Sequence, residues 1–253
     1  MKVYLDNNVI IDIEQEKIDI NGLSQNLGEE ITDIYYSAAH IHELNEITAD
    51  NKEELTNRLT KRFQTIEEIT KNKYLFHELP SNIVYEQLES PKVVYETINQ
   101  IPFARDSMKS MINIVSEKQK ETFREYIGIN LMEINNYEPS DVIQHINKKL
   151  DVLQGFSFLE IIEKSVEFHH DGKSFGIHNR FGGIFELLDM IGYWKDKFNE
   201  KSNYARLWDS NHAYFASFCE AFISNDKRTR NKALVAYNIY NIKTKVFSPF
   251  KKS

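Results

Sequence analysis

Cysteine is nearly absent from this chain of 253 residues, which contains only Cys219. One cysteine excludes an internal disulfide framework and any zinc site of four cysteines. Long apolar runs are also absent, because the best stretch, Gly182 to Trp194, is interrupted by Glu186 and Asp189. The sequence therefore predicts no membrane span. The N-terminus reaches an acid at Asp6 without a long apolar core, so we expect no signal peptide and a cytoplasmic location.

A positive net charge is lacking too, since the chain carries a formal charge of −7. Nucleic-acid-binding domains are more often basic, so this value alone argues against such a partner. The charge is uneven, however. Residues 1–200 hold 21 Lys and Arg against 35 Asp and Glu, a balance of −14, whereas residues 201–253 hold 10 against 3, a balance of +7. Such asymmetry indicates a basic surface that could face a polyanion.

Short apolar runs predict β-strands at residues 2–5, 34–36, 74–79, 221–223 and 243–247. Amphipathic segments predict helices at residues 9–14, 38–47, 52–72, 103–116, 118–135, 140–153, 157–170 and 183–198. No strand is predicted between residues 80 and 200, and the stretch from His169 to Phe181 is expected to form a loop. Ser37 and Asp209 are expected to N-cap the helices that follow them. Strands that alternate with helices are typical of a parallel sheet in an α/β fold.

Acidic residues follow the predicted strands. Asp6 and Asp226 come just after two of them, and Glu43 lies on the helix after a third. Asp209, at the predicted start of a helix, is a fourth candidate. Ligand crevices open at the carboxyl ends of parallel strands, so these acids are expected to converge there. Unpaired carboxylates repel one another unless a cation is bound or some are protonated. Mg²⁺ or Mn²⁺ suits such oxygen ligands, and a pair of these ions can clamp the oxygens of a phosphodiester displacement.

Four segments carrying these acids resemble the motifs of the PIN-domain ribonucleases. They are Val3 to Ile11, Ser37 to Leu44, Asp209 to Ala216 and Phe222 to Lys227, in the family's order. Asn7 and Ser224 stand where Thr is common in the family, and His212 stands where an apolar residue is commoner. The resemblance covers roughly residues 1–75 and 203–250 and leaves the helical middle unexplained.

The resemblance implies a three-layer α/β/α fold with a central parallel sheet. Residues 1–80 and 200–253 would form the nuclease core, and residues 81–199 a large helical insertion packed on it. It also implies a metal-dependent endoribonuclease in which Asp6, Glu43, Asp209 and Asp226 hold Mg²⁺ or Mn²⁺ and activate a water against an RNA phosphate. Asn8, Ser224 and Asn225 would support these acids. A role as a toxin or phage-defence effector, a protein inhibitor or defence partner, and a homodimer are further implications.

A basic run follows Asp226 directly and consists of Lys227, Arg228, Arg230 and Lys232. It could contact RNA phosphates or be an ordinary solvated face. Tyr237 and Tyr240 could stack on bases, although ordinary packing is the commoner role for such residues.

Several alternatives stay open in the sequence. Asp6, Asp209 and Asp226 could be plain turn or capping residues, and Glu46 competes with Glu43. Asp189 could join the acids or be a partly exposed helix residue. His40 and His42 make a poor zinc chelate, because residues two apart point to different sides of a helix. Cys219 is expected to be a small core residue.

Two other functions compete with the ribonuclease. One is a non-catalytic scaffold of PIN type that binds partners through its helical insertion. The other is a structure-specific DNA nuclease.

Overall fold

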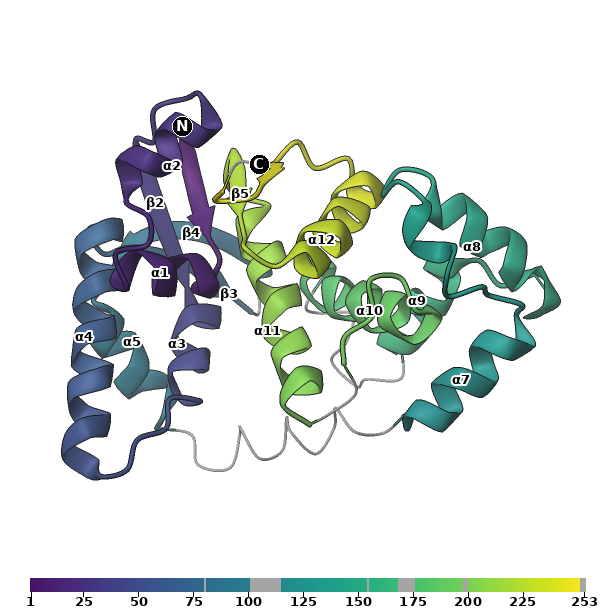
Figure 1. Cartoon of the computed structure of the whole chain (residues 1–253), viewed down its shortest axis with the longest axis horizontal. Coiled ribbons are helices and arrows are strands. Elements are labelled where there is room, and N and C mark those ends of the chain that lie inside the picture. The colour runs from purple at the N-terminus through teal and green to yellow at the C-terminus, as the bar shows by residue number, and fades with distance from the viewer. Residues whose placement is uncertain (80, 101–114, 154, 168–175, 198–199, 251–253) are drawn as a thin grey trace.

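The computed structural model describes residues 1–79, 81–100, 115–153, 155–167, 176–197 and 200–250 (Figure 1). Its centre is a six-stranded sheet in the order β4-β3-β2-β1-β5-β6. The strands are β1 (Lys2–Leu5), β2 (Asp33–Ser37), β3 (Lys73–Glu78), β4 (Ile83–Leu88), β5 (Ala221–Ile223) and β6 (Lys245–Phe247). All neighbours pair in parallel except β3 and β4, which are antiparallel. The predicted α/β class with a largely parallel sheet is confirmed.

Strand β1 lies in the middle of the sheet, and its side chains alternate between two buried faces. Val3 and Leu5 pack into one core, whereas Tyr4 packs into the other. Both faces are covered because alternate residues of a strand point in opposite directions and all three are apolar or aromatic. Helices therefore pack on both sides of the sheet.

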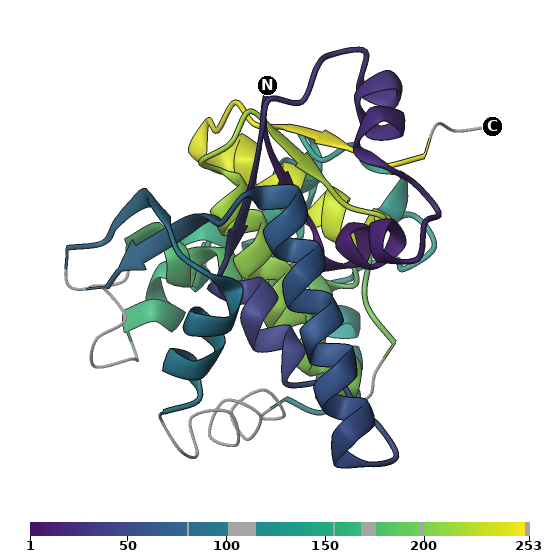
Figure 2. The same ribbon diagram turned by 90° about the vertical axis from the view of Figure 1, so that its left-hand side faces the viewer.

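One face is covered by helices from the first hundred residues. These are α1 (Asn7–Glu14), α2 (Ile20–Leu27), α4 (Lys52–Thr70) and α5 (Pro91–Ile98), with α3 (Ala38–Leu44) at the sheet's carboxyl edge. Figure 2 shows α4 running along this side. Ser37 begins α3 as predicted, because its side chain accepts a hydrogen bond from the Ala39 amide at 3.2 Å.

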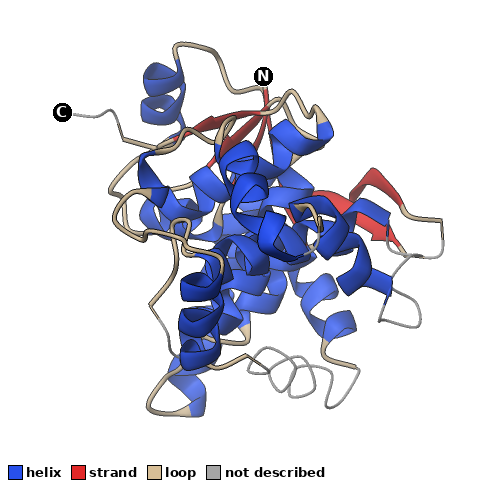
Figure 3. Ribbon diagram, turned by 90° about the vertical axis from the view of Figure 1, so that its right-hand side faces the viewer, coloured by secondary structure: helices blue, strands red, loops and turns tan. Residues whose placement is uncertain are grey.

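The other face packs against α11 (Glu200–Ala216) and α12 (Lys227–Tyr240), which contact β1, β5 and β6. Behind them lie α7 (Glu117–Tyr126), α8 (Val142–Leu150), α9 (Phe158–Glu167) and α10 (Gly176–Ile191), with short 3₁₀ turns at Ile134–Asn136 and Asp151–Leu153. Figure 3 shows that the side of the molecule formed by this region is almost wholly helical. No helix in the described ranges is long and apolar enough to cross a membrane.

Several predictions for the middle of the chain were wrong. Residues 83–88 form strand β4 instead of belonging to a helical region. A short turn after β3 brings these residues back beside β3, where they pair with it in antiparallel orientation. The helix predicted over 118–135 ends at Tyr126, and α10 begins at Gly176, inside the segment predicted as a loop. The helix predicted over 103–116 and the pair His169 and His170 lie outside the described residues, apart from the final two positions of that helix.

Asp209 does not cap a helix. Helix α11 begins at Glu200, so Asp209 lies in its interior. The residues before it, from Tyr204 to Trp208, already place apolar side chains on the buried face of this helix. The helix predicted to start at Asp209 is therefore the second half of a longer one, and capping does not account for this aspartate.

Candidate functional site

Four acids reach the carboxyl edge of the sheet from four different elements. Asp6 follows β1, Glu43 lies on α3 after β2, Asp209 lies on α11, and Asp226 comes three residues after β5. We call these four residues the acidic edge. The Asp6 amide donates to the Ile223 carbonyl at 2.8 Å, which fixes the ends of β1 and β5 side by side. The four acids that the sequence predicts to converge therefore lie near one edge of the sheet.

Asp6 is buried and held by polar neighbours. Ser224 Oγ donates to its carboxylate at 2.5 Å and Asn8 Nδ2 at 2.7 Å. Asp6 stands at the N-cap of α1, but its side chain makes no capping bond. Burial is the main cause that raises the pKa of Asp6, and the charge of Glu43 adds to it, although His212 and Ser224 act in the opposite direction. A capping role therefore does not explain this residue.

His212 connects the acids, and the sequence gave it no role. Its Nε2 lies 3.1 Å from Glu43 Oε2 and 4.0 Å from Asp6 Oδ1, while Nδ1 lies 2.9 Å from the Tyr4 hydroxyl. Burial lowers the pKa of His212, but the hydrogen bond and charge of Glu43 outweigh it and the pKa is raised. The one indication in the sequence was that His212 is polar at a position where the similar PIN-domain motif usually has an apolar residue.

His40 and His42 have structural roles. The Ser37 amide donates to His40 Nδ1 at 3.1 Å, and His40 Nε2 lies 2.8 Å from the Leu5 carbonyl. Burial holds the pKa of His40 well below its usual value, so the neutral ring suits this pair of bonds. His42 stacks on Trp208 with ring centroids 4.5 Å apart. These contacts account for both rings without a metal.

Asp209 differs from the other three acids because its carboxylate makes no hydrogen bond or ion pair within the described residues. It is partly buried. Burial raises its pKa well above the usual value, and the charges of Asp6, Asp196, Glu43 and Asp226 raise it further, in that order. The other three carboxylates of the acidic edge therefore lie close enough to Asp209 to raise its pKa.

Asp226 N-caps α12 by accepting from the Arg228 amide at 2.7 Å. The loop before it is hydrogen-bonded to the start of α1. Its own amide donates to Ser224 Oγ at 3.1 Å, and the Asn225 amide donates to Asn8 Oδ1 at 2.8 Å. Asn8, Ser224 and Asn225 thus connect the loop that carries Asp226 to the start of α1.

In the part of the chain that the structure describes, no group of three or more His, Cys, Asp or Glu side chains is arranged to hold a metal ion. Glu43 is turned to His212 and Asp226 to the start of α12. The four carboxylates are nonetheless the hard oxygen donors that Mg²⁺ and Mn²⁺ prefer.

The basic run does not act as a unit. Lys232 is buried and pairs with Asp196 at 3.0 Å, so its predicted contact with a phosphate is wrong. Arg230 Nη1 donates to the Ser224 carbonyl at 2.6 Å. Arg228 lies between Asp196 at 3.3 Å and Asp226 at 3.8 Å, while Lys227 is exposed.

Three remaining expectations can be placed. Tyr237 is buried and donates to the Ala213 carbonyl at 2.7 Å, so it packs in the core. Tyr240 stacks on Phe181, which also indicates packing. Cys219 is buried as expected, and burial raises its thiol pKa to about 12. Glu46 is exposed and lies beyond the end of α3, so Glu43 is the acid at the edge.

Of the alternatives for Asp189, that of a partly exposed helix residue is wrong. It is 4% exposed and belongs to a set of charges that we call the buried ion network. Its acids are Asp189 and Asp196, and its cations are Lys120, Arg206 and Lys232. Burial would raise the pKa of Asp189, but Arg206, Lys232 and Lys120 outweigh it and the pKa is lowered. The residues next to Asp189 in sequence are apolar, so they gave no indication of its cationic partners. These partners come from three other helices, α7, α11 and α12.

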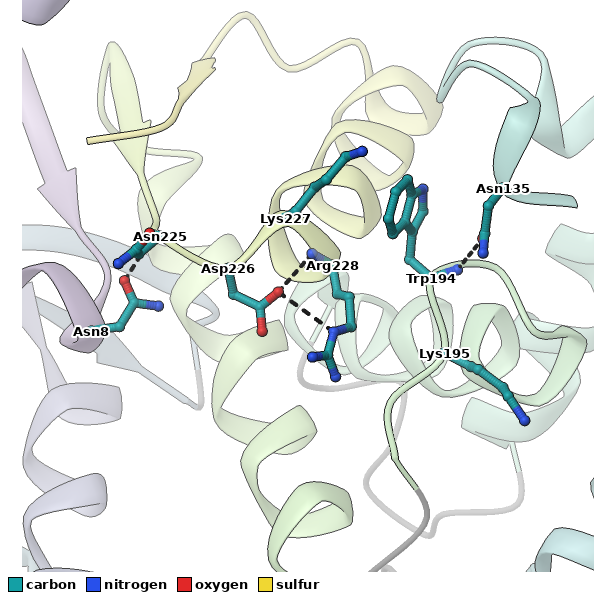
Figure 4. A pocket seen from close by; sticks show the side chains of 8 residues that line it. All are labelled: Asn8, Asn135, Trp194, Lys195, Asn225, Asp226, Lys227 and Arg228. Carbon is teal, nitrogen blue, oxygen red and sulfur yellow. Dashed lines mark hydrogen bonds and ion pairs between the residues drawn. The ribbon is translucent and has the colours of Figure 1, made fainter. Parts of the chain in front are cut away.

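A surface pocket of about 620 Å³ opens beside Asp226 (Figure 4). It is lined by Asn8, Asn135, Trp194, Lys195, Asn225, Asp226, Lys227 and Arg228. The sequence gave no reason to place Asn135, Trp194 and Lys195 near the acids, because they lie at least 31 positions away from Asp226 along the chain.

The chain matches no family model, no curated protein and no solved structure. Its function is inferred from the geometry of these residues.

Proposed function

We propose that the protein is a Mg²⁺- or Mn²⁺-dependent endoribonuclease with a PIN-like fold, and that the acidic edge is its active site. The carrying observation is Asp209, an unpaired carboxylate whose pKa is raised by burial and by the other acids of the edge. Strongly perturbed carboxyl groups that lack a structural partner are candidates for function. The order of the motifs and the largely parallel sheet also support this interpretation.

The donor set fits a divalent cation chemically, although the side chains are not preassembled around one. Asp6, Glu43, Asp209 and Asp226 would hold the ion. When bound, the ion would lower the pKa of a water molecule and stabilise the negative charge of the phosphate in the transition state.

The chain's own residues prepare the site in three ways. Ser224 and Asn8 fix the carboxylate of Asp6. His212 holds Glu43 through a hydrogen bond and, when its ring is protonated, offsets one negative charge of the edge. Arg228 and Lys227 lie next to Asp226 and would attract the phosphates that flank the scissile bond, so RNA binding should weaken with salt.

The test is cleavage of a short single-stranded RNA in Mg²⁺ or Mn²⁺. We expect wild-type protein to cleave it, EDTA to stop the reaction, and Asp6→Asn to slow it at least about 100-fold, as for loss of a group that acts on the reacting atoms. Asp33→Asn is the matched control, because Asp33 lies at the opposite end of the neighbouring strand β2. It should cleave at the wild-type rate.

Other outcomes would overturn the proposal. Equal rates for Asp6→Asn and wild type would remove the site assignment. Faster cleavage of a flapped DNA than of RNA would favour the structure-specific DNA nuclease. An absence of cleavage, together with no calorimetric Mn²⁺ binding below the millimolar range, would favour the non-catalytic scaffold.

A further inference from the structure

The pocket beside Asp226 has a positive wall. Lys227 and Arg228 supply this wall, and Arg228 already pairs with Asp196 at 3.3 Å and with Asp226 at 3.8 Å. Lys195 lies on the Trp194 side of the pocket and pairs with Glu117 at 3.3 Å (Figure 4). Lys227 and Arg228 lie in the first turn of α12, where cations are unfavourable because the helix dipole is positive there. Lys227 is exposed, and its ammonium has no carboxylate partner within the described residues. Helix stability therefore does not explain the cation of Lys227, whereas an anionic ligand in the pocket would.

Trp194 forms the opposite wall and offers a flat aromatic surface (Figure 4). Its backbone is fixed, since its amide donates to Asn135 Oδ1 at 2.6 Å. Lys227 Nζ lies 4.2 Å from the centroid of its ring, so the indole and this cation meet across the pocket. The Lys227 side chain is long and exposed, and it can exchange the indole for a phosphate. An aromatic face binds any nucleobase by stacking, and the cation binds the phosphate.

Amide groups complete the lining. The Asn135 NH₂ group has no hydrogen-bond partner within the described residues, because the bond to Trp194 uses only its Oδ1. A free amide donor beside an aromatic ring can bond to the acceptors on a base edge. The pocket volume of about 620 Å³ lies in the range of small-ligand sites, about 300–1,000 Å³.

We propose that this pocket binds one nucleotide of single-stranded RNA, next to the phosphate at the acidic edge. Its base would stack on Trp194, and its phosphate would lie between Lys227 and Arg228. This rests on the proposed nuclease function, because Asp226 belongs both to the pocket and to the edge. Asn135, Trp194 and Lys195 come from the helical middle of the chain, so that region would contribute to the recognition of substrate.

The experiment measures binding of fluorescein-labelled oligouridylate by anisotropy in EDTA, where a metal-dependent nuclease cannot cleave. We expect Trp194→Ala to weaken binding at least about fivefold, the lower end of one lost stacking contact, and Trp194→Phe to retain most of the affinity. Lys227→Ala should weaken binding and reduce the salt slope by about 0.7, as for one lost phosphate contact with a single strand.

Matched controls are available on the exposed surface of α7. Tyr126→Ala removes an aromatic ring that is 64% exposed, and Lys118→Ala removes an exposed cation. Both should bind RNA as wild type does. Lys227→Ala keeps the test valid if Trp194→Ala does not fold, because the Lys227 side chain is exposed.

The proposal fails if the pocket variants bind oligouridylate as tightly as the controls. This failure is distinct from failure of the nuclease. Wild-type protein that cleaves RNA while the pocket variants bind it normally would remove the pocket assignment alone. Protein that binds RNA through Trp194 and Lys227 but never cleaves it would remove the nuclease and keep the nucleotide site.

Discussion

Two groups of aspartates in this protein have opposite surroundings. In the buried ion network, Asp189 is surrounded by Lys120, Arg206 and Lys232, and its pKa is lowered. On the acidic edge, Asp209 has other acids as neighbours, and its pKa is raised. Arg228 touches an acid of each group, Asp196 and Asp226. The aspartates of the two groups therefore have different roles, although they are the same type of residue.

The difference separates structural acids from candidate functional ones. The carboxylate of Asp189 is neutralised inside the protein, so it holds helices together. The carboxylate of Asp209 lacks a partner within the described residues, so it is free to bind a metal ion. Perturbed acids occur in both kinds of site, and the presence or absence of cationic partners distinguishes them.

The largest expected effect is on the network. Asp189→Asn should lower the free energy of unfolding by about 3–5 kcal/mol, because it removes the buried carboxylate that Lys120, Arg206 and Lys232 share. Urea denaturation of wild type and variant measures this loss. Asp151→Asn, at an exposed position just after α8, is the control and should be nearly neutral. A loss no larger than that of the control would show that Asp189 is not structural.

Acidification should reveal part of the same contribution. Since the folded-state pKa of Asp189 is lowered, its stabilisation is complete above the usual aspartate pKa of about 3.9 and is lost as the pH falls through the folded value. The stability difference between wild type and Asp189→Asn should be constant near neutral pH and shrink below about pH 4. Denaturation curves across this range test it, and a difference that grows on acidification would contradict it.

The smallest effect should have the opposite sign. Asp209→Asn removes one charge from a repelling group, so in EDTA the free energy of unfolding should rise by about 1 kcal/mol, the scale of the repulsion between two unit charges about 4 Å apart in water. RNA cleavage should be lost in the same variant. If Asp209→Asn destabilised the protein as Asp189→Asn does, Asp209 would also be structural, and the contrast between the two groups would disappear.

Local patterns predicted much of the fold. The strands β1, β2, β3, β5 and β6 and the cap at Ser37 could be predicted because apolar runs and capping residues act over a few positions. Strand β4 could not, because its pairing depends on β3. The start of α11 was predicted wrongly at Asp209, because aspartate is a common capping residue. In the structure the helix already begins at Glu200, so Asp209 lies in its interior.

By itself, the sequence determined the order of strands and acids along the chain, and hence which carboxylates reach one edge of a parallel sheet. Only the tertiary structure decided which acids are neutralised. Ion pairing depends on distances of a few ångströms between residues far apart in sequence, such as Lys120 and Asp189 or His212 and Glu43. For the same reason, Trp194 and Lys227 could be assigned to one pocket only after the chain had folded.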